Sequence, residues 1–248
     1  MKNRSNNARL TTSVFAMLCL LLPGAARAIS VGQIDNFEDG TLQGWRMGIT
    51  TVTNSHMANI ATGGPAGTGD SFLQVIADGT AVQGGRMTFF NKTQWTGNYT
   101  AAVITAITMD LKNISSSEAL NLRLAIDGGT YTTSIDFIGG KFSTAASISL
   151  DSGSDWTRVV FSLLPGDLIP VCSPGPICSL GNDVQATLAN VRELRLLNST
   201  NPDWNGLPVA GKLGIDNIQA VPLPPALALF GSGLVVLLTR RRKNNIQT

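Results

Sequence analysis

Short runs of apolar and β-branched residues recur along residues 29–220, separated by glycine, asparagine and aspartate. In LNLRLAID (120–127), apolar and polar residues alternate, so Leu120, Leu122, Leu124 and Ile126 are expected on one face of a strand. The DGG motif that follows predicts a hairpin turn into the next run. Strands are predicted at 33–37, 71–77, 85–91, 102–113, 120–127, 130–138, 157–163, 191–198 and 212–221.

Helical patterns are nearly absent from the same region. Only DVQATLAN (183–190) has the composition of a short helix. No segment rich in proline or serine divides residues 29–220, so they form one predicted domain. An all-β fold follows, and this many short strands in one domain favours a two-sheet sandwich.

The N-terminal segment differs from this pattern. Lys2, Arg4 and Arg9 precede an apolar run at 12–22, and the small residues of ARA (26–28) follow it. This arrangement is typical of a signal peptide. We therefore expect Sec-dependent export and removal of residues 1–28 by signal peptidase, with a short uncut anchor as the alternative.

The C-terminal segment also has a separate pattern. Residues 223–238 carry no charge and would cover about 24 Å as a helix, a little less than a ~30 Å hydrocarbon core. The basic cluster 240–243 follows directly and would stay cytoplasmic, which places residues 29–220 outside the membrane. The alternative is a core strand with a solvated basic end.

The segment VPLPPALALFGSGLVVLLTRRRK (221–243) resembles the VPLPA variant of the PEP-CTERM sorting signal. The resemblance implies that an exosortase-type transpeptidase in the inner membrane of a Gram-negative, exopolysaccharide-producing bacterium removes the tail. Residues 221–248 would then be a transient membrane anchor and afterwards a substrate. The matching residues are the motif Val221, Pro222, Leu223 and Pro224 and the basic residues Arg240, Arg241 and Arg242.

The net charge of residues 29–220 differs from that of the whole chain. The two end segments hold eight of the eighteen basic residues and no acidic one. Residues 29–220 therefore keep ten basic and sixteen acidic residues, a net charge of −6. This balance argues against a nucleic-acid-binding protein. Thirteen of the sixteen acidic residues are aspartate, which suits turns and divalent-cation sites.

Two cysteines remain after signal removal, Cys172 and Cys178, in PVCSPGPICSL. An oxidising compartment and a short loop between them predict a disulfide, with two unpaired thiols as the alternative. The spacing, without a nearby histidine, does not suit a zinc site.

Four phrases spread over the domain resemble a jelly-roll carbohydrate-binding module: NFEDGTLQGW (36–45), GGPAGTGDSFLQV (63–75), SDWTRVVFSL (154–163) and LGIDNIQAV (213–221). The resemblance implies adjacent first and last strands with a structural calcium ion beside them. Glu38 and Asp216 stand at the matching positions, and the turn at Asp70 offers further oxygen atoms, the donors calcium prefers. The alternative is that these acidic residues only form turns and strand ends.

Catalytic chemistry is poorly represented, and we expect no enzyme. The single histidine, His56, has no G-x-S-x-G motif to accompany it. Only Glu38, Glu118 and Glu193 supply glutamate carboxylates for a glycosidase pair, although aspartates remain as candidates. A secreted glycan-active enzyme is therefore the alternative.

Binding to extracellular polysaccharide is the favoured function. Sugar rings pack on aromatic rings, and polar groups nearby bind their hydroxyls. Aromatic residues beside polar turns are the candidates, although such residues also cover the ends of sandwiches. A structural or adhesive matrix protein without a glycan site is the other alternative. The candidate glycan contacts are Trp95, Tyr99, Tyr131 and Trp204.

Overall fold

The structure is a computed structural model that describes residues 29–115, 117–128, 130–131, 137–171 and 183–222. The predicted signal peptide, the tail from Leu223 onward with Pro224 and Arg240–Arg242, and both Cys172 and Cys178 lie outside the described residues. The disulfide and the two end segments therefore stay predictions.

No helix within the described ranges is long and apolar enough to cross a membrane.

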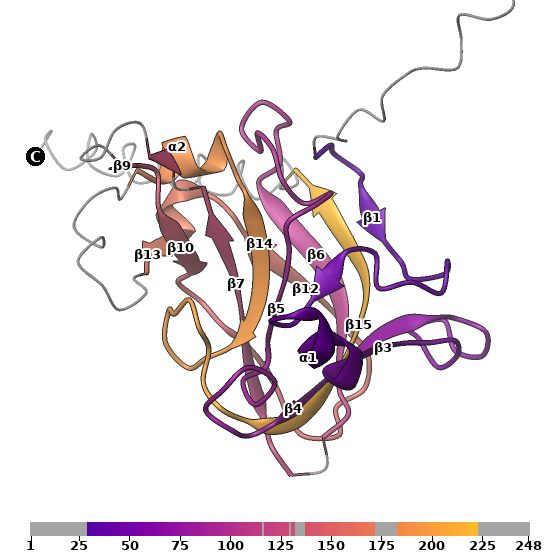
Figure 1. Cartoon of the computed structure of the whole chain (residues 1–248). Coiled ribbons are helices and arrows are strands. Elements are labelled where there is room, and N and C mark those ends of the chain that lie inside the picture. Colours follow the sequence, from indigo (N-terminus) through magenta and orange to yellow (C-terminus); the bar gives the residue numbers. More distant parts are fainter. Residues whose placement is uncertain (1–28, 116, 129, 132–136, 172–182, 223–248) are drawn as a thin grey trace, which may run out of the picture.

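Two antiparallel sheets lie face to face, which confirms the predicted two-sheet sandwich (Figure 1). Sheet A has the order β12 (Thr157–Ser162), β6 (Ala106–Asn113), β15 (Ala210–Val221), β4 (Phe72–Asp78) and β3 (Met57–Ile60), and β1 (Ile34–Asp35) also pairs with β15. Sheet B has the order β13 (Leu168–Pro170), β10 (Lys141–Thr144), β7 (Leu120–Asp127), β14 (Glu193–Asn198), β5 (Thr88–Asn91) and β2 (Trp45–Arg46), and β11 (Ile148–Leu150) also pairs with β7.

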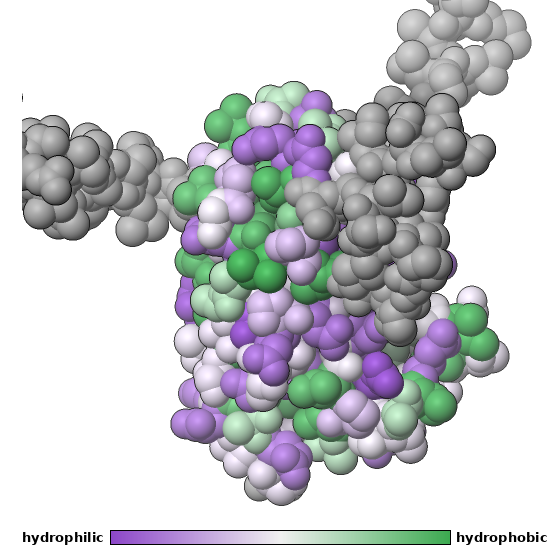
Figure 2. Space-filling model, turned by 90° about the vertical axis from the view of Figure 1, so that its left-hand side faces the viewer, coloured by the Kyte–Doolittle hydropathy of each residue, from purple (hydrophilic) through white to green (hydrophobic). Residues whose placement is uncertain are grey.

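The remaining elements are short. Strands β8 (Thr130–Tyr131) and β9 (Phe137–Ile138) pair with each other. The helices are α1 (Thr50–His56), α2 (Val184–Leu188) and the 3₁₀ turn η1 (Pro165–Asp167). On the face shown in Figure 2, hydrophobic residues lie among hydrophilic ones rather than in one continuous apolar area.

The core fills the space between the sheets, and the alternation in the sequence accounts for it. Leu120, Leu122, Leu124 and Ile126 of β7 are all fully buried in this core, as predicted. Burial of such side chains is the main favourable contribution to folding, at about 25 cal/mol per Å² of apolar surface. Strands of both sheets add residues to the same interior because their alternate positions face inward.

Two expectations about local structure are wrong. The DGG motif does not join β7 to β8 as a hairpin, because β10, β11 and β14 already occupy the edges of β7. Strand β8 pairs with β9 instead. Helix α1 was not expected, since its sequence TTVTNSH is rich in β-branched residues. The Thr53 hydroxyl supports its first turn by bonding to the Met47 and Ile49 carbonyls.

The first and last strands are adjacent, as the family resemblance implied. Ile34 and Asp35 of β1 pair with Gln219 and Ile218 of β15. Asp35 is buried there and accepts hydrogen bonds from the indole N–H groups of Trp45 and Trp95, at 2.8 and 2.6 Å. Burial raises the pKa of Asp35, whereas the bonds from Trp95 and Trp45 favour its charged form.

This network explains why Trp95 and Tyr99 do not lie on the surface. Both side chains are 0% exposed and belong to the core. The Tyr99 hydroxyl donates to the Trp95 carbonyl, so the two residues of the KTQWTGNYT segment close one end of the sandwich. The expectation that they form an exposed glycan platform is therefore wrong.

We predict that Trp95→Phe lowers the free energy of unfolding by about 1–3 kcal/mol, because it keeps a ring but removes a donor from buried Asp35. Urea denaturation measures this loss. The control is Trp156→Phe, whose indole N–H bonds the Gly63 carbonyl at an exposed site where water can replace it. Equal losses for the two variants would contradict the role assigned to Asp35.

Candidate binding cleft

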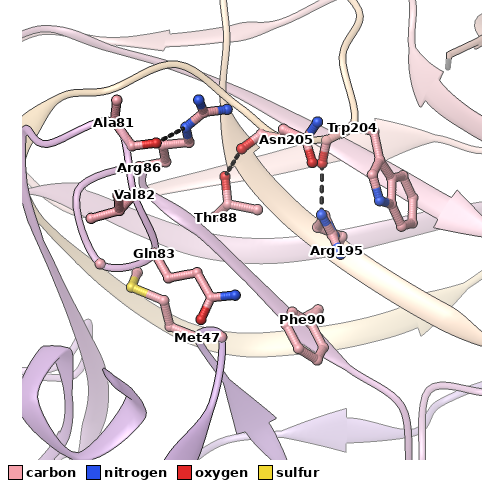
Figure 3. Close-up of a pocket in the computed structure, with 12 residues that line it drawn as sticks. Met47, Ala81, Val82, Gln83, Arg86, Thr88, Phe90, Arg195, Trp204 and Asn205 are labelled. Carbon is pink, nitrogen blue, oxygen red and sulfur yellow. Dashed lines mark hydrogen bonds between the residues drawn. The ribbon is translucent and has the colours of Figure 1, made fainter. Parts of the chain in front are cut away.

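An open cleft of about 500 Å³ lies on the outer face of sheet B (Figure 3). Its floor comes from β5 and β14, where Phe90 and Arg195 face each other across the strand pair. The neighbouring pair, Phe89 and Leu196, faces the core. The lining residues are Met47, Gly48, Ala81, Val82, Gln83, Gly84, Arg86, Thr88, Phe90, Arg195, Trp204 and Asn205.

Two loops form the walls, and hydrogen bonds hold them together. The Arg86 guanidinium donates to the Ala81 carbonyl at 3.0 Å in one wall and to the Gly206 carbonyl at 3.3 Å in the other. The Thr88 hydroxyl donates to the Asn205 carbonyl at 2.8 Å. The walls are therefore fixed to the floor before any ligand arrives, which lowers the entropic cost of binding.

Aromatic rings and cations alternate along the floor. The Arg195 guanidinium lies 4.0 Å from the centre of the Trp204 ring and 5.3 Å from the centre of the Phe90 ring. The Lys141 ammonium also lies near the Trp204 ring, 4.7 Å from its centre. Arg46 and Lys92 lie 5.0 and 5.2 Å from the centre of the Phe90 ring. Such contacts are attractive because the face of an aromatic ring is electronegative.

Trp204 is held in place from several directions. Its ring packs on Ala125 and Leu197 of sheet B, and only 4% of the residue is exposed. Arg195 donates to its carbonyl at 2.8 Å. The buried Arg123 guanidinium bonds the Ser199 and Thr200 carbonyls and so fixes the start of the same loop. Burial lowers the pKa of Arg123 from its usual value.

The predicted aromatic contacts are thus distributed over different parts of the molecule. Trp204 is the one of these residues that lines the cleft, and only 4% of it is exposed. Trp95 and Tyr99 lie in the core. Tyr131 is part of β8, but its side chain lies outside the described residues.

The cleft residues that were not predicted from the sequence are Phe90, Gln83, Arg86, Arg195 and Asn205. The segment TFFN (88–91) could have indicated that one phenylalanine is exposed, because consecutive residues of a strand face opposite sides. If one of the two phenylalanines enters the core, the other must lie on the outer face. The loop residues Gln83 and Asn205 had no comparable signal, since their position depends on how the loops fold back over the strands.

The residues predicted to bind calcium lie at the other sheet. Asp110 and Asp216 are opposite each other on β6 and β15, beside a bulge between Asp216 and Gln219. Glu38 accepts a hydrogen bond from the Ser71 amide at 2.9 Å, and Asp70 accepts one from the Ala66 amide at 2.6 Å. No group of three or more acidic, histidine or cysteine side chains in the described part of the chain has the arrangement of a metal site.

The electrostatics nevertheless show that these acidic residues are neighbours. Burial raises the pKa of Asp216 to about 7, and the negative charges of Asp70, Asp110 and Glu38 add to the increase. The Asn217 amide, which donates to Asp216 at 2.7 Å, acts in the opposite direction. Arg158, 3.1 Å from Asp110, is the nearest counter-charge in the ion pairs of the described residues. Asp70, Asp110 and Glu38 are therefore close enough for their charges to act on the Asp216 carboxylate.

Comparison with known proteins finds similarity at the level of structure. No family model matches the chain. No curated protein sequence matches it either. A family 11 carbohydrate-binding module from Clostridium thermocellum, solved with a β-1,3-1,4-mixed-linked tetrasaccharide, is 16% identical and has a TM-score of 0.49, over 77% of this chain and 96% of that one. A xylan-binding domain from Paenibacillus barcinonensis is 15% identical with a TM-score of 0.42, over 79% and 99%.

An exo-β-agarase is also similar, with 12% identity and a TM-score of 0.49 over 79% of this chain and 26% of that one.

We predict that the calcium-free protein loses stability as the pH rises from about 4 to about 7. The pKa of Asp216 is higher in the folded protein than in the unfolded chain, so the folded protein binds the Asp216 proton more tightly. The stabilisation that this proton gives the folded state is complete below about pH 4 and is lost as the pH rises through 7. The loss is on the order of 3 kcal/mol, at about 1.4 kcal/mol per pKa unit.

Urea denaturation in the presence of a chelator, repeated at several pH values, measures this change. Asp216→Asn should flatten the profile between pH 4 and 7. Asp155→Asn, which removes an exposed carboxylate whose pKa is lowered by hydrogen bonds from Trp156 and Lys112, should leave that window unchanged. A profile that keeps its slope in Asp216→Asn would contradict the assignment.

Proposed function

We propose that the chain is an exported, non-catalytic cell-surface or extracellular-matrix protein that binds polysaccharide in the cleft of sheet B. The observation that carries the proposal is a partly exposed aromatic ring, Phe90, inside an open cleft with polar groups on both walls. The volume, about 500 Å³, lies within the range of about 300–1,000 Å³ usual for small-molecule sites.

The polar groups of the cleft suit the hydroxyls of a sugar. Gln83 and Asn205 lie on opposite walls, and each side-chain amide offers two donor hydrogens and an acceptor oxygen. No hydrogen bond to either amide is made by another of the described residues. Arg86 and Arg195 add charged donors beside them. A sugar ring packed on Phe90 would have hydrogen-bonding partners on either side.

The lining chemistry supports binding rather than catalysis. The residues that line the cleft within the described ranges include no aspartate, glutamate, histidine or cysteine. General acid–base or nucleophilic attack on a glycosidic bond depends on such groups. The arrangement therefore favours a site that holds polysaccharide without cutting it.

We predict that Phe90→Ala weakens retention on polysaccharide about tenfold, because stacking on an aromatic ring contributes on the order of 1 kcal/mol or more. Affinity electrophoresis through gels that contain the polymer, including the producer's own exopolysaccharide, measures retention. The control Trp156→Ala removes a partly exposed aromatic residue from sheet A, where it packs against Phe72 at 5.3 Å.

The result separates the three candidate functions. Retention that is lost in Phe90→Ala and kept in Trp156→Ala supports the cleft. A folded protein with no retention, but with self-association, would favour a structural matrix protein. The appearance of new reducing ends would favour an enzyme.

A structural calcium ion between the ends of β1 and β15 is part of the proposal. The oxygen-rich set Glu38, Asp70 and Asp216 fits a hard cation, and Asp110 extends it. A bound cation would offset the mutual repulsion of these carboxylates. Urea denaturation near pH 8 should then show that added calcium increases the free energy of unfolding of the wild type and has little effect on Asp216→Asn.

We further propose that the tail is a transient inner-membrane anchor that an exosortase-type enzyme removes, so that the domain reaches the cell surface or the medium. Strand β15 ends at Val221, which is also the first residue of the sorting motif Val221, Pro222, Leu223 and Pro224. Cleavage near the motif would therefore leave both sheets complete. Export of the domain would place the cleft where extracellular polysaccharide is present.

We predict that the extracellular form of the protein ends near Val221. Intact-mass spectrometry of the chain recovered from the medium or the cell surface checks this. Replacing Pro222 and Pro224 with alanine should leave the chain unprocessed in the membrane fraction. A released chain that still carries Arg240–Lys243 would refute tail processing.

A further inference from the structure

Positive charge gathers on the outer face of sheet B, although residues 29–220 as a whole carry a net charge of −6. Six of their ten basic residues lie on this face or at the rim of the cleft. One row of cross-strand neighbours places Arg46, Phe90, Arg195 and Ala125 side by side over four strands. The six basic residues are Arg46, Arg86, Lys92, Arg123, Lys141 and Arg195.

The carboxylates on the same face are fewer. Glu193 is buried between Lys92 and Arg195, with carboxylate-to-nitrogen distances of 2.9 and 2.5 Å. Asp127 is opposite Glu193 and Lys141 in register. Asp203 accepts hydrogen bonds from the Trp204 and Asn205 amides at the loop. Three acidic residues therefore face six basic ones, and positive charge remains in excess.

The excess is located at the cleft. Arg86 and Arg195 line it, and within the described residues no carboxylate does. Neither Arg46 nor Arg86 forms an ion pair with any of the described residues. Arg46 is exposed beside Phe90, and Arg86 is partly exposed on the wall. The Arg46 guanidinium is available to an anion from solvent, and the Arg86 guanidinium offers the N–H groups that do not bond the Ala81 and Gly206 carbonyls. A planar guanidinium matches the geometry of a carboxylate or sulfate.

The opposite sheet carries the negative charge. The outer face of sheet A holds the neighbouring carboxylates Glu38, Asp70, Asp110 and Asp216. Lys112, Arg158 and Lys212 offset part of this charge, so sheet A does not offer an anionic polymer the positive excess that sheet B does. Charge arranged in this way orients an approaching polymer and increases its rate of association with the cleft.

We propose that the ligand of the cleft is an acidic polysaccharide, in which the sugar units bear carboxylate or sulfate groups. The inference rests on the proposed function of the cleft and specifies the class of polymer. The pyranose ring of such a sugar packs on Phe90, and its anionic group meets the guanidinium of Arg46 or Arg86 at the rim. The side-chain amides of Gln83 and Asn205 bind the neutral hydroxyls.

The test compares polymers that differ mainly in charge. Full-length protein is titrated by isothermal titration calorimetry with polygalacturonate and its methyl ester, and with carboxymethyl- and hydroxyethyl-cellulose. We expect binding to the acidic member of at least one pair and binding at least tenfold weaker to its neutral partner. Binding should also weaken between 0.1 and 1 M salt, as the screening length falls from about 10 to about 3 Å.

A double variant locates the effect. Arg46→Gln with Lys92→Gln should weaken binding to the acidic polymer roughly tenfold, because both exposed cations border the Phe90 ring and each contributes a severalfold factor. The matched control is Lys112→Gln with Lys212→Gln, which removes the same charge from β6 and β15 of sheet A. It should change the affinity less than twofold.

Each alternative outcome has a distinct meaning. Equal binding to charged and uncharged polymers, or binding to the neutral ones alone, would overturn the acidic-ligand inference while leaving polysaccharide binding in place. Equal losses in the two double variants would overturn it as well, as would equally tight binding of duplex DNA. If the folded protein binds none of the polymers, both this inference and the proposed function fail.

Discussion

The antiparallel pairing of β5 with β14 determines both the interior and the exterior of this protein. The register places Phe89 opposite Leu196 inside the sandwich and Phe90 opposite Arg195 outside it. A slip of one residue would exchange the two pairs and destroy the core and the cleft together. The core requires this register. The burial of Phe89 and Leu196, which stabilises the fold, therefore also places Phe90 in the cleft.

The two sheets carry different chemistry on their outer faces. On sheet A, burial raises the pKa of Asp216 to about 7, and the negative charges of Asp70, Asp110 and Glu38 add to the increase. Sheet B instead alternates rings and cations, with Arg195 between Phe90 and Trp204. On sheet A, the repulsion between the carboxylates has to be offset by protonation or by a bound cation. On sheet B, the excess positive charge is available to a ligand.

Sequence patterns predicted the parts of the fold that depend on neighbouring residues. The alternation in 120–127 predicted β7 with its correct bounds, because side chains of a strand face alternate sides. The burial of Trp95 could not be predicted in this way, since its partner Asp35 lies 60 positions away. The cleft depends in the same way on loops that meet only in the folded chain, as the bond from Thr88 to Asn205 across 117 positions shows. The assignment of Glu38, Asp70 and Asp216 to a calcium site came from a family resemblance that pointed to the chain ends that β1 and β15 bring together, and it stays a prediction.

The central claim is that sheet B, through its cleft, is the glycan-binding face. Hydrogen–deuterium exchange of the full-length protein, with and without a saturating acidic oligosaccharide, tests it most directly. The account predicts slower exchange in β5, β14 and the loops that contain Gln83 and Asn205, with sheet A unchanged. Protection confined to β6, β15 and the loop at Asp70, with none around Phe90, would contradict it.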